Sequence, residues 1–223
     1  MIEIKNLNKI YLKGKKNMVH ALNNINLKID DRETVAIIGE SGAGKSTLLH
    51  IMSCIDNFDG EYYLDNIDIN KLSESKKSKL RSSKIGIVLQ DFALIDDFTV
   101  FENVMTPLYF NKTIKDKKGS VMRALKKTGI VSLKAKKVSQ LSGGQKQRVA
   151  ISRALVTSPE YIFADEPTGS LDSKTSEEIV KMLFDLNRNG ITIVIVTHNL
   201  EIANQCHHII EIKDGNIIKD ICS

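Results

Sequence analysis

Cysteine is scarce in this sequence, and long apolar runs are missing. Cys54, Cys206 and Cys222 are its three cysteines, and their spacing matches no metal-binding or redox motif. An odd number of scattered cysteines favours a reducing compartment over a disulfide framework. Apolar runs such as "ITIVIV" at 191–196 have the length of a strand, whereas roughly 20 apolar residues are needed to span a bilayer. The first residues also lack the apolar stretch of a secretory signal, so we expect a chain that is soluble by itself.

A strong charge bias is missing too. The 223 residues include 32 basic and 27 acidic ones, a net charge of +5. The basic excess is clustered at 76–84, 111–118 and 133–137. Such clusters are most simply solvated faces, and contact with an anionic membrane surface or with nucleic acid is the alternative. Because there is no internal repeat, linker or low-complexity tract, we expect one domain with a small inserted subdomain.

Buried strands alternate with helices along most of the chain. Continuous apolar runs at 33–39, 84–90, 161–165 and 191–196 are typical of strands buried on both faces. Helical patterns occupy 45–55, 74–84 and 173–190, where Gly190 is placed as a stop. This alternation predicts an α/β fold with a mostly parallel sheet covered by helices on both faces.

The two ends of the chain and its middle depart from that alternation. Apolar and polar residues alternate at 1–12 and 20–29, which predicts a half-exposed antiparallel β region. A further strand is expected at 61–69, and a closing hairpin at 207–220 with Asp214-Gly215 as its turn. From 99 to 138 two helices follow each other without a strand. We therefore divide the chain into a core, 1–90 and 158–223, and a helical subdomain at about 91–157.

A phosphate-binding loop follows the strand at 33–39. The segment "GESGAGKS" fits G-x-x-x-x-G-K-[ST], with the expected strand before it and helix after it. Its backbone N–H groups and the helix N-terminus would face the phosphates of ATP. Lys45 would reach the β- and γ-phosphates, and the Ser46 hydroxyl would bind Mg²⁺. The predicted nucleotide-binding residues here are Gly39, Glu40, Ser41, Gly42, Ala43, Gly44, Lys45, Ser46 and Thr47.

Two acids end the strand at 161–165. Asp165 lies at the carboxyl end of a strand next to the phosphate-binding loop, where Mg²⁺ would sit. Glu166 is one residue further along and points elsewhere. We interpret Glu166 as the general base that polarises a water for attack on the γ-phosphate. The alternative for Glu166 is a helix-capping or surface acid.

Further polar residues end neighbouring strands. His198 follows the strand at 191–196 and would contact the γ-phosphate or orient the water. Gln90 ends the strand at 84–90 and would contact the metal or the water. Tyr11 taken alone is a surface or core aromatic, although a flat ring can stack on adenine. The pair at 207–208, two histidines without a third ligand in the sequence, is interpreted as structural.

A second glycine-rich loop, Leu141 to Gln145, precedes another helix. Together, "GESGAGKST", "LSGGQ", "ADEPTGSLD" and "VTH" occur in the order found in ATP-binding subunits of ABC transporters, which the chain resembles from Met1 to about Lys219. The resemblance implies a P-loop ATPase core with an N-terminal antiparallel β subdomain and an inserted helical subdomain. It also implies ATP hydrolysis with Mg²⁺ as cofactor.

The resemblance assigns further roles by position. Tyr11 matches the adenine-stacking aromatic, Gln90 the glutamine that binds the metal and links it to the membrane partner, and His198 the switch histidine. In this family two copies pair head to tail, so that the signature loop of one copy holds the nucleotide bound by the other. The residues that would take part across this interface are Ser142, Gly143, Gly144, Gln145 and Asp172.

The run "ADEPTGSLDSKT" resembles the branch of lipoprotein-release, macrolide-exporter and cell-division types. It implies a separate transmembrane permease with a large extracytoplasmic domain, a position at the cytoplasmic face of the membrane, and export of a peptide, lipoprotein or antimicrobial. A cell-division ATPase that regulates cell-wall hydrolysis and an amino-acid importer are the alternatives. DNA- and ribosome-acting relatives need long insertions or two ATPase domains, for which this chain has no room, so no nucleic-acid partner is expected.

Two segments depart from the family pattern, at three positions. Val138 stands where a proline is frequent, three residues before the signature leucine. Asp96 and Asp97 stand in the segment that would meet the membrane subunit, where apolar residues or proline are common. These acids would reflect the choice of partner.

Overall fold

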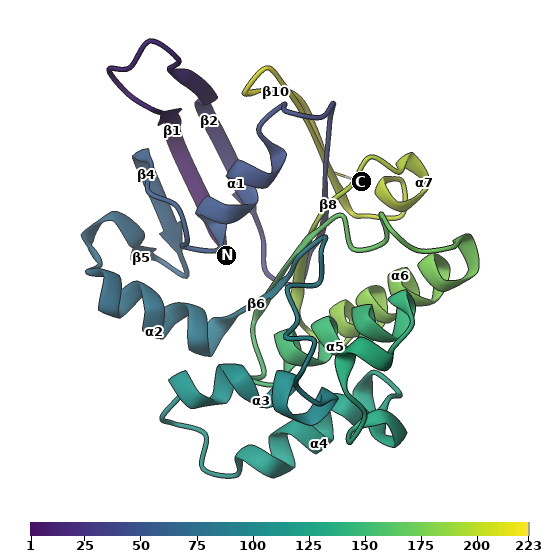
Figure 1. Cartoon of the computed structure of the whole chain (residues 1–223). Helices are drawn as coiled ribbons and strands as arrows, with labels where there is room; N and C mark the ends of the chain where they lie inside the picture. The colour runs from purple at the N-terminus through teal and green to yellow at the C-terminus, as the bar shows by residue number, and fades with distance from the viewer. Residues whose placement is uncertain (223) are drawn as a thin grey trace.

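The structure is a computed structural model that describes residues 1–222. It contains two β-sheets (Figure 1). The first sheet is antiparallel, with the strand order β2-β1-β4-β5. Its strands are β1 (Ile2–Tyr11), β2 (Val19–Ile29), β4 (Asp59–Leu64) and β5 (Ile67–Asp68). The second has the order β10-β9-β3-β8-β7-β6, and all its strands are parallel except β10. Its strands are β3 (Thr34–Ile38), β6 (Ile85–Val88), β7 (Tyr161–Asp165), β8 (Thr192–Val196), β9 (His208–Lys213) and β10 (Asn216–Cys222).

The six-stranded sheet is buried on both faces, as its apolar runs predict. In β7, Tyr161 and Phe163 pack on one face with α1 (Lys45–Met52) and the antiparallel sheet. Ile162 and Ala164 of the same strand pack on the other face with the helices. Since neighbouring residues of a strand point to opposite faces, both sets must be apolar. The predicted α/β class, the antiparallel β region near the N-terminus and the closing hairpin are confirmed.

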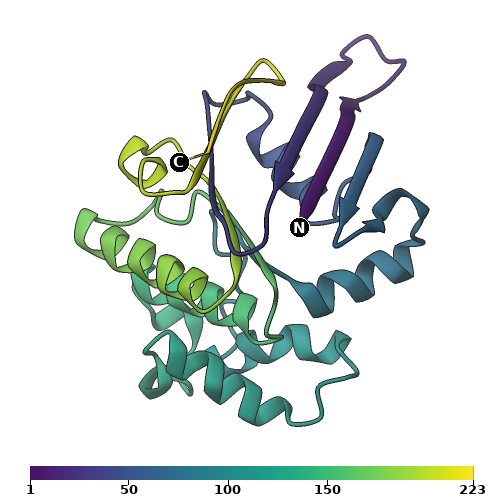
Figure 2. The same cartoon turned by 180° about the vertical axis from the view of Figure 1, so that it is seen from behind.

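Helices cover the second face of this sheet and one end of the molecule. Figures 1 and 2 place α3 and α4 at the end away from the antiparallel sheet, with α5 and α6 beside the parallel strands. The helices after α1 are α2 (Glu74–Lys84), α3 (Val100–Phe110), α4 (Lys117–Lys127), α5 (Gly143–Leu155), α6 (Ser173–Arg188) and α7 (Leu200–Ala203), with 3-10 turns at Ile69–Lys71, Val131–Leu133 and Val138–Gln140. One apolar cluster joins α3, α4 and α5 to β7 and β8, so the subdomain boundaries stay a prediction. No helix within residues 1–222 has both the length and the apolar character needed to cross a bilayer.

Some expected element boundaries were wrong. The single strand expected at 61–69 is interrupted, because Asp65 and Asn66 have positive φ angles of 51° and 62° and turn the chain between β4 and β5. The loop expected to extend to Gln145 ends at Ser142, where α5 is capped. The Ser142 Oγ accepts a hydrogen bond from the Gln145 N–H, and the Gln145 Oε1 accepts one from the Ser142 N–H. This capping box draws Gly143 into the first turn.

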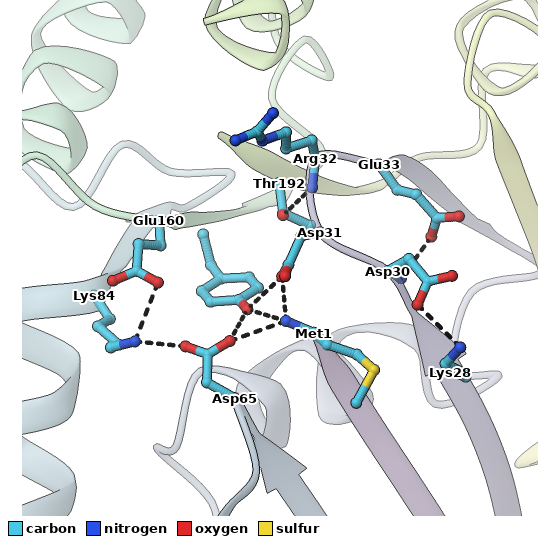
Figure 3. A network of polar contacts seen from close by, with 11 residues as sticks. Met1, Lys28, Asp30, Asp31, Arg32, Glu33, Asp65, Lys84, Glu160 and Thr192 are labelled. Atoms are coloured by element: carbon cyan, nitrogen blue, oxygen red, sulfur yellow. Dashed lines mark hydrogen bonds and ion pairs between the residues drawn. The ribbon is translucent and has the colours of Figure 1, made fainter. Parts of the chain in front are cut away.

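A polar network ties the two sheets together (Figure 3). The Asp65 carboxylate accepts hydrogen bonds from the Met1 amino group at 2.9 Å, the Tyr161 hydroxyl at 2.5 Å and the Lys84 ammonium at 2.5 Å. Asp31 binds the same amino group and hydroxyl. Burial alone would raise the pKa of Asp65, but the donated hydrogen bonds outweigh it and lower that pKa to about 2. The network therefore holds an ionised carboxylate at the junction of the sheets.

Candidate active site

A cleft of about 530 Å³ opens at the carboxyl ends of the parallel strands. This is the edge where ligands bind in open α/β sheets. Residues from six separate segments line it, and most of the predicted nucleotide-binding residues are among them. These predicted residues are Tyr11, Gly39, Ser41, Gly42, Gly44, Lys45, Ser46, Thr47, Gln90, Asp165, Glu166 and His198. Val19, His20, Ala21 and Val196 complete the lining.

The phosphate-binding loop carries a buried cation. Lys45 is 9% exposed, and its Nζ donates hydrogen bonds to the backbone carbonyls of Gly39 and Glu40 at 2.8 and 2.7 Å. No carboxylate of residues 1–222 forms an ion pair with Lys45. Since a buried charge without a counter-ion is costly, this ammonium favours an anionic ligand such as a polyphosphate.

Gly39, the first residue of the phosphate-binding loop, has no space for a side chain. Gly39 has a φ of +144°, and a Cβ there would lie 2.1 Å from the Ile212 carbonyl oxygen. A larger residue would therefore displace the start of the loop. Two predicted residues of this loop lie outside the cleft lining: Glu40 is exposed and Ala43 is buried, with its carbonyl accepting the Gly215 N–H at 3.0 Å. Glu40 and Ala43 therefore contribute their backbone groups, rather than their side chains, to the phosphate-binding loop.

Asp165 and Ser46 supply hard oxygen donors to the same cleft. Asp165 ends β7, is 8% exposed and forms no ion pair with any residue of the described chain. Ser46 is exposed on the first turn of α1. A buried carboxylate without a cationic partner, beside a hydroxyl and a phosphate-binding loop, fits the oxygen-rich ligand set of Mg²⁺. Gln90 is exposed at the end of the segment after β6 and adds an amide to this edge.

Glu166 and His198 face each other at the rim of the cleft. The His198 Nδ1 lies 2.9 Å from the Glu166 Oε1. The second oxygen of Glu166, Oε2, is buried and has no hydrogen-bond partner within residues 1–222. Glu166 also has a φ of 44°, a conformation that non-glycine residues adopt rarely and that occurs at functional sites. One oxygen is thus oriented by a histidine while the other is available to accept a proton.

Tyr11 lies at the other end of the cleft and is partly exposed. Its hydroxyl donates a hydrogen bond to the Asp56 carboxylate at 2.7 Å, and the Lys9 ammonium lies 4.8 Å from the ring centroid. The hydrogen bond fixes the ring at the cleft, where a planar base could stack on it. The sequence alone did not distinguish this position from a core aromatic.

The residues predicted to act across the head-to-tail interface lie outside this cleft. Ser142 and Gly143 are exposed at the N-terminus of α5, and neither they nor Gly144, Gln145 or Asp172 line the cleft. A Cβ on Gly144 would lie 2.4 Å from the Thr175 Cγ2, so α5 packs closely on α6 there. Asp172 caps α6, accepting the Thr175 N–H at 3.0 Å and the Thr175 hydroxyl at 2.6 Å. These hydrogen bonds lower the pKa of Asp172.

The sequence did not lead us to Gln147, which connects the residues at the start of α5 with the cleft residues around Glu166. It is 1% exposed on α5, and its Nε2 donates a hydrogen bond to the Pro167 carbonyl at 2.7 Å, next to Glu166. A glutamine on the apolar face of a helix is the signal that could have found it. The signature helix is thereby attached to the loop that carries the predicted base.

Two of the three residues that depart from the family pattern, Val138 and Asp96, have local partners. Val138 is buried, and its N–H donates a hydrogen bond to the Phe98 carbonyl at 3.0 Å, which a proline could not form. Asp96 forms an ion pair with Lys146 of α5 at 3.5 Å. The first contact holds the segment after Gln90 against the turn that precedes α5, and the second holds it against α5 itself.

These features define a P-loop nucleotide hydrolase with its cleft at the carboxyl edge of a parallel sheet. Comparison with known proteins gives the family. Residues 22–169 match the family described as "ABC transporter". The chain is 44% identical over 227 residues to an uncharacterised ABC transporter ATP-binding protein of Methanocaldococcus jannaschii, covering 99% of this chain and 96% of that protein. A solved dimeric, post-hydrolysis structure of that cassette, bound to ADP and Pi, superposes with a TM-score of 0.91 at 42% identity, covering 100% and 98% of the two chains.

A longer relative is also similar. The macrolide export ATP-binding/permease protein MacB of Mannheimia succiniciproducens is 45% identical over 222 residues, which cover 99% of this chain but 34% of that protein. The chain thus spans about a third of the length of this relative. The chain belongs to the ABC transporter family as an ATP-binding domain of the class that hydrolyses ATP. The expected family and fold are confirmed.

Proposed function

We propose that this chain hydrolyses ATP as one of two identical subunits and thereby drives a separate membrane permease that exports a peptide, lipoprotein or antimicrobial. The observation that carries the catalytic part is the Glu166 carboxylate. Its Oε1 is held by His198 at 2.9 Å and its Oε2 is buried without a partner. A carboxylate so placed can accept the proton of a water that attacks the γ-phosphate.

The remaining residues of the cleft have distinct tasks in this proposal. The Lys45 ammonium turns from its two carbonyl partners to the β- and γ-phosphates and compensates their charge. Tyr11 stacks on the adenine, and His198 orients the attacking water through the proton it shares with Glu166. Ser46, Asp165 and Gln90 would hold Mg²⁺, which neutralises phosphate charge when bound. Because Lys45 and Asp165 are buried, their charges would interact more strongly with the phosphates and with Mg²⁺ than they would in water.

A second copy of the chain completes the site. Ser142 and Gly143 are exposed and lie outside the cleft of their own chain. In a head-to-tail pair they would bring the N-terminus of α5, with its free N–H groups, to the γ-phosphate of the partner copy. The similarity to a dimeric cassette structure supports this arrangement. Gly144, Gln145 and Asp172 would adjoin the same interface.

The permease is proposed to contact the surface beside Gln90. A groove of about 350 Å³ lies there, between the exposed side chains of Ile55 and Phe110, and Leu89 forms part of its wall. Exposed apolar patches mark interaction sites. The similarity to a macrolide exporter supports an exporting partner, and the branch resemblance adds a large extracytoplasmic domain to that partner. The chain would then lie at the cytoplasmic face of the membrane.

The test is the Glu166→Gln variant, studied by an ATPase assay and by size-exclusion chromatography with and without ATP and Mg²⁺. We expect loss of turnover and an ATP-dependent shift to a dimer. Glu201→Gln is the matched control, because Glu201 is an exposed carboxylate on the helix after His198 that does not line the cleft. A Glu166→Gln variant that still hydrolyses ATP would refute the assignment of the base. An inactive but monomeric variant would keep the base and make the permease necessary for pairing.

A further inference from the structure

A cluster of potential metal ligands lies at the opposite edge of the six-stranded sheet from the nucleotide cleft. Glu33 directly precedes β3, His208 begins β9, and Cys222 of β10 is the residue paired with His208 across the antiparallel ladder. One ligand atom from each of these three residues lies within 4.8 Å of the others. Because β3 and β9 are parallel, Glu33 and His208 share the amino edge of the sheet.

The histidine at the centre of this cluster has an unused nitrogen. His208 is 2% exposed, and its Nδ1 has no hydrogen-bond partner within residues 1–222. The nearest carboxylate oxygen, the Glu33 Oε2, is 3.6 Å away, which is too far for a hydrogen bond. The Nε2 contacts the Asp220 Oδ1 at 2.5 Å. If the Nε2 donates its proton to Asp220, the lone pair of the Nδ1 is directed toward Glu33.

We propose that Glu33, His208 and Cys222 bind a zinc-class divalent cation, with Asp220 as the positioning residue that orients the imidazole. A carboxylate, an imidazole and a thiolate form the mixed O, N, S ligand set that Zn²⁺ accepts, whereas Mg²⁺ prefers oxygens alone. A carboxylate on the second ring nitrogen is the usual outer contact of a metal-bound histidine. Cys222 is exposed, so the ion can enter and a water can be its fourth ligand.

The local charges favour a cation at this place. Within residues 1–222, neither Glu33 nor Asp220 forms an ion pair with a lysine or arginine, and both pair with His208. Burial raises the pKa of the Cys222 thiol, and the nearby charges of Glu33, Asp220 and Asp30 raise it further. A bound cation would reverse this effect and deprotonate the thiol. Without an ion, the competing explanation is a His208 that is held in place by its contacts with the two carboxylates alone.

The reactivity of Cys222 toward a disulfide reagent distinguishes these explanations. Cys54 and Cys206 are buried, and burial raises their pKa values to about 11 and about 12, so Cys222 is the thiol that reacts in the folded protein. We expect equimolar Zn²⁺ added to the nucleotide-free protein to slow the labelling of Cys222 about tenfold or more, because the bound thiolate is no longer free to attack. Mg²⁺ should have no effect.

Variants then identify the ligands. Glu33→Gln and His208→Asn should each abolish the protection by Zn²⁺, and Asp220→Asn should weaken Zn²⁺ binding about 10–100-fold. His50→Asn, on α1 and outside the cluster, is the control that should keep it. Circular dichroism checks that the variants fold. If His208→Asn does not fold because His208 is buried, Glu33→Gln alone tests the ligand set. Unchanged labelling in the presence of Zn²⁺, or equal protection in Glu33→Gln, would overturn the proposal and leave His208 held by the two carboxylates alone.

Discussion

Replacing Asp65 by asparagine tests the network that joins the two sheets. Asparagine has the same shape and tolerates the φ of 51° at this position. Lys84 keeps a partner in the variant, because it also pairs with Glu160 at 3.1 Å. The change therefore removes the charge of Asp65 and replaces one of its two acceptor oxygens with an NH2 group.

The magnitude follows from the lowered pKa of Asp65. A fall from 3.8 to about 2 corresponds to about 2.5 kcal/mol at neutral pH, at about 1.4 kcal/mol per pKa unit. The side chain is 23% exposed, so solvent screening reduces the expected loss in Asp65→Asn to about 1–2 kcal/mol. A carboxylate with a lowered pKa stabilises the fold above its unfolded pKa and loses this effect as the pH falls. The difference in the free energy of unfolding between the unmutated protein and Asp65→Asn should thus have its full size above about pH 5. It should shrink between about pH 4 and pH 2.

Urea unfolding followed by circular dichroism at several pH values measures this difference. Asp59→Asn is the control, since Asp59 pairs with Lys13 on the surface and both side chains are about 70% exposed (69% and 72%); we expect a change within about 0.5 kcal/mol. If the stability difference caused by Asp65→Asn did not depend on pH, the ionised carboxylate would not be its source, and the reasoning would be refuted.

Two further predictions concern the signature helix. Val138→Pro should lower the free energy of unfolding by about 1 kcal/mol, because the hydrogen bond from the Val138 N–H to the Phe98 carbonyl is lost; an unchanged urea midpoint would contradict this. Gly144→Ala should destabilise the protein, since the new Cβ would meet the Thr175 Cγ2 at 2.4 Å. Adding Thr175→Ser removes that methyl group and should restore part of the loss in thermal unfolding, and a double variant no more stable than Gly144→Ala would refute the steric explanation.

The fold class could be predicted because its signals are local. Apolar runs of strand length, such as 191–196, require burial on both faces, and the loop at 39–46 carries its own phosphate-binding pattern. The turn at Asp65 and Asn66 was missed because these residues adopt positive φ without needing glycine. The start of α5 was misplaced because Gly143 and Gly144 are typical of a loop, although the capping box at Ser142 places them in the first turn of the helix.

The contacts around the site were less accessible to sequence reasoning. The convergence of Gln90, Asp165, Glu166 and His198 on one cleft followed from their places at the ends of parallel strands. The hydrogen bond from Gln147 to the Pro167 carbonyl joins residues 20 positions apart, and no spacing rule predicts such a pair. The same holds for Tyr161 and Asp65, which lie 96 positions apart.

The hydrogen bond between Gln147 and Pro167 has a consequence for cooperativity. In the proposed pair, the N-terminus of α5 contacts the nucleotide of the partner copy, while Gln147 on the same helix holds the loop beside Glu166. Occupancy of one site therefore biases the position of Glu166, the proposed base, in the other, and coupling between binding sites is reciprocal. ATP turnover should then rise with a Hill coefficient above one, and Gln147→Leu should lower that coefficient toward one while ATP still binds.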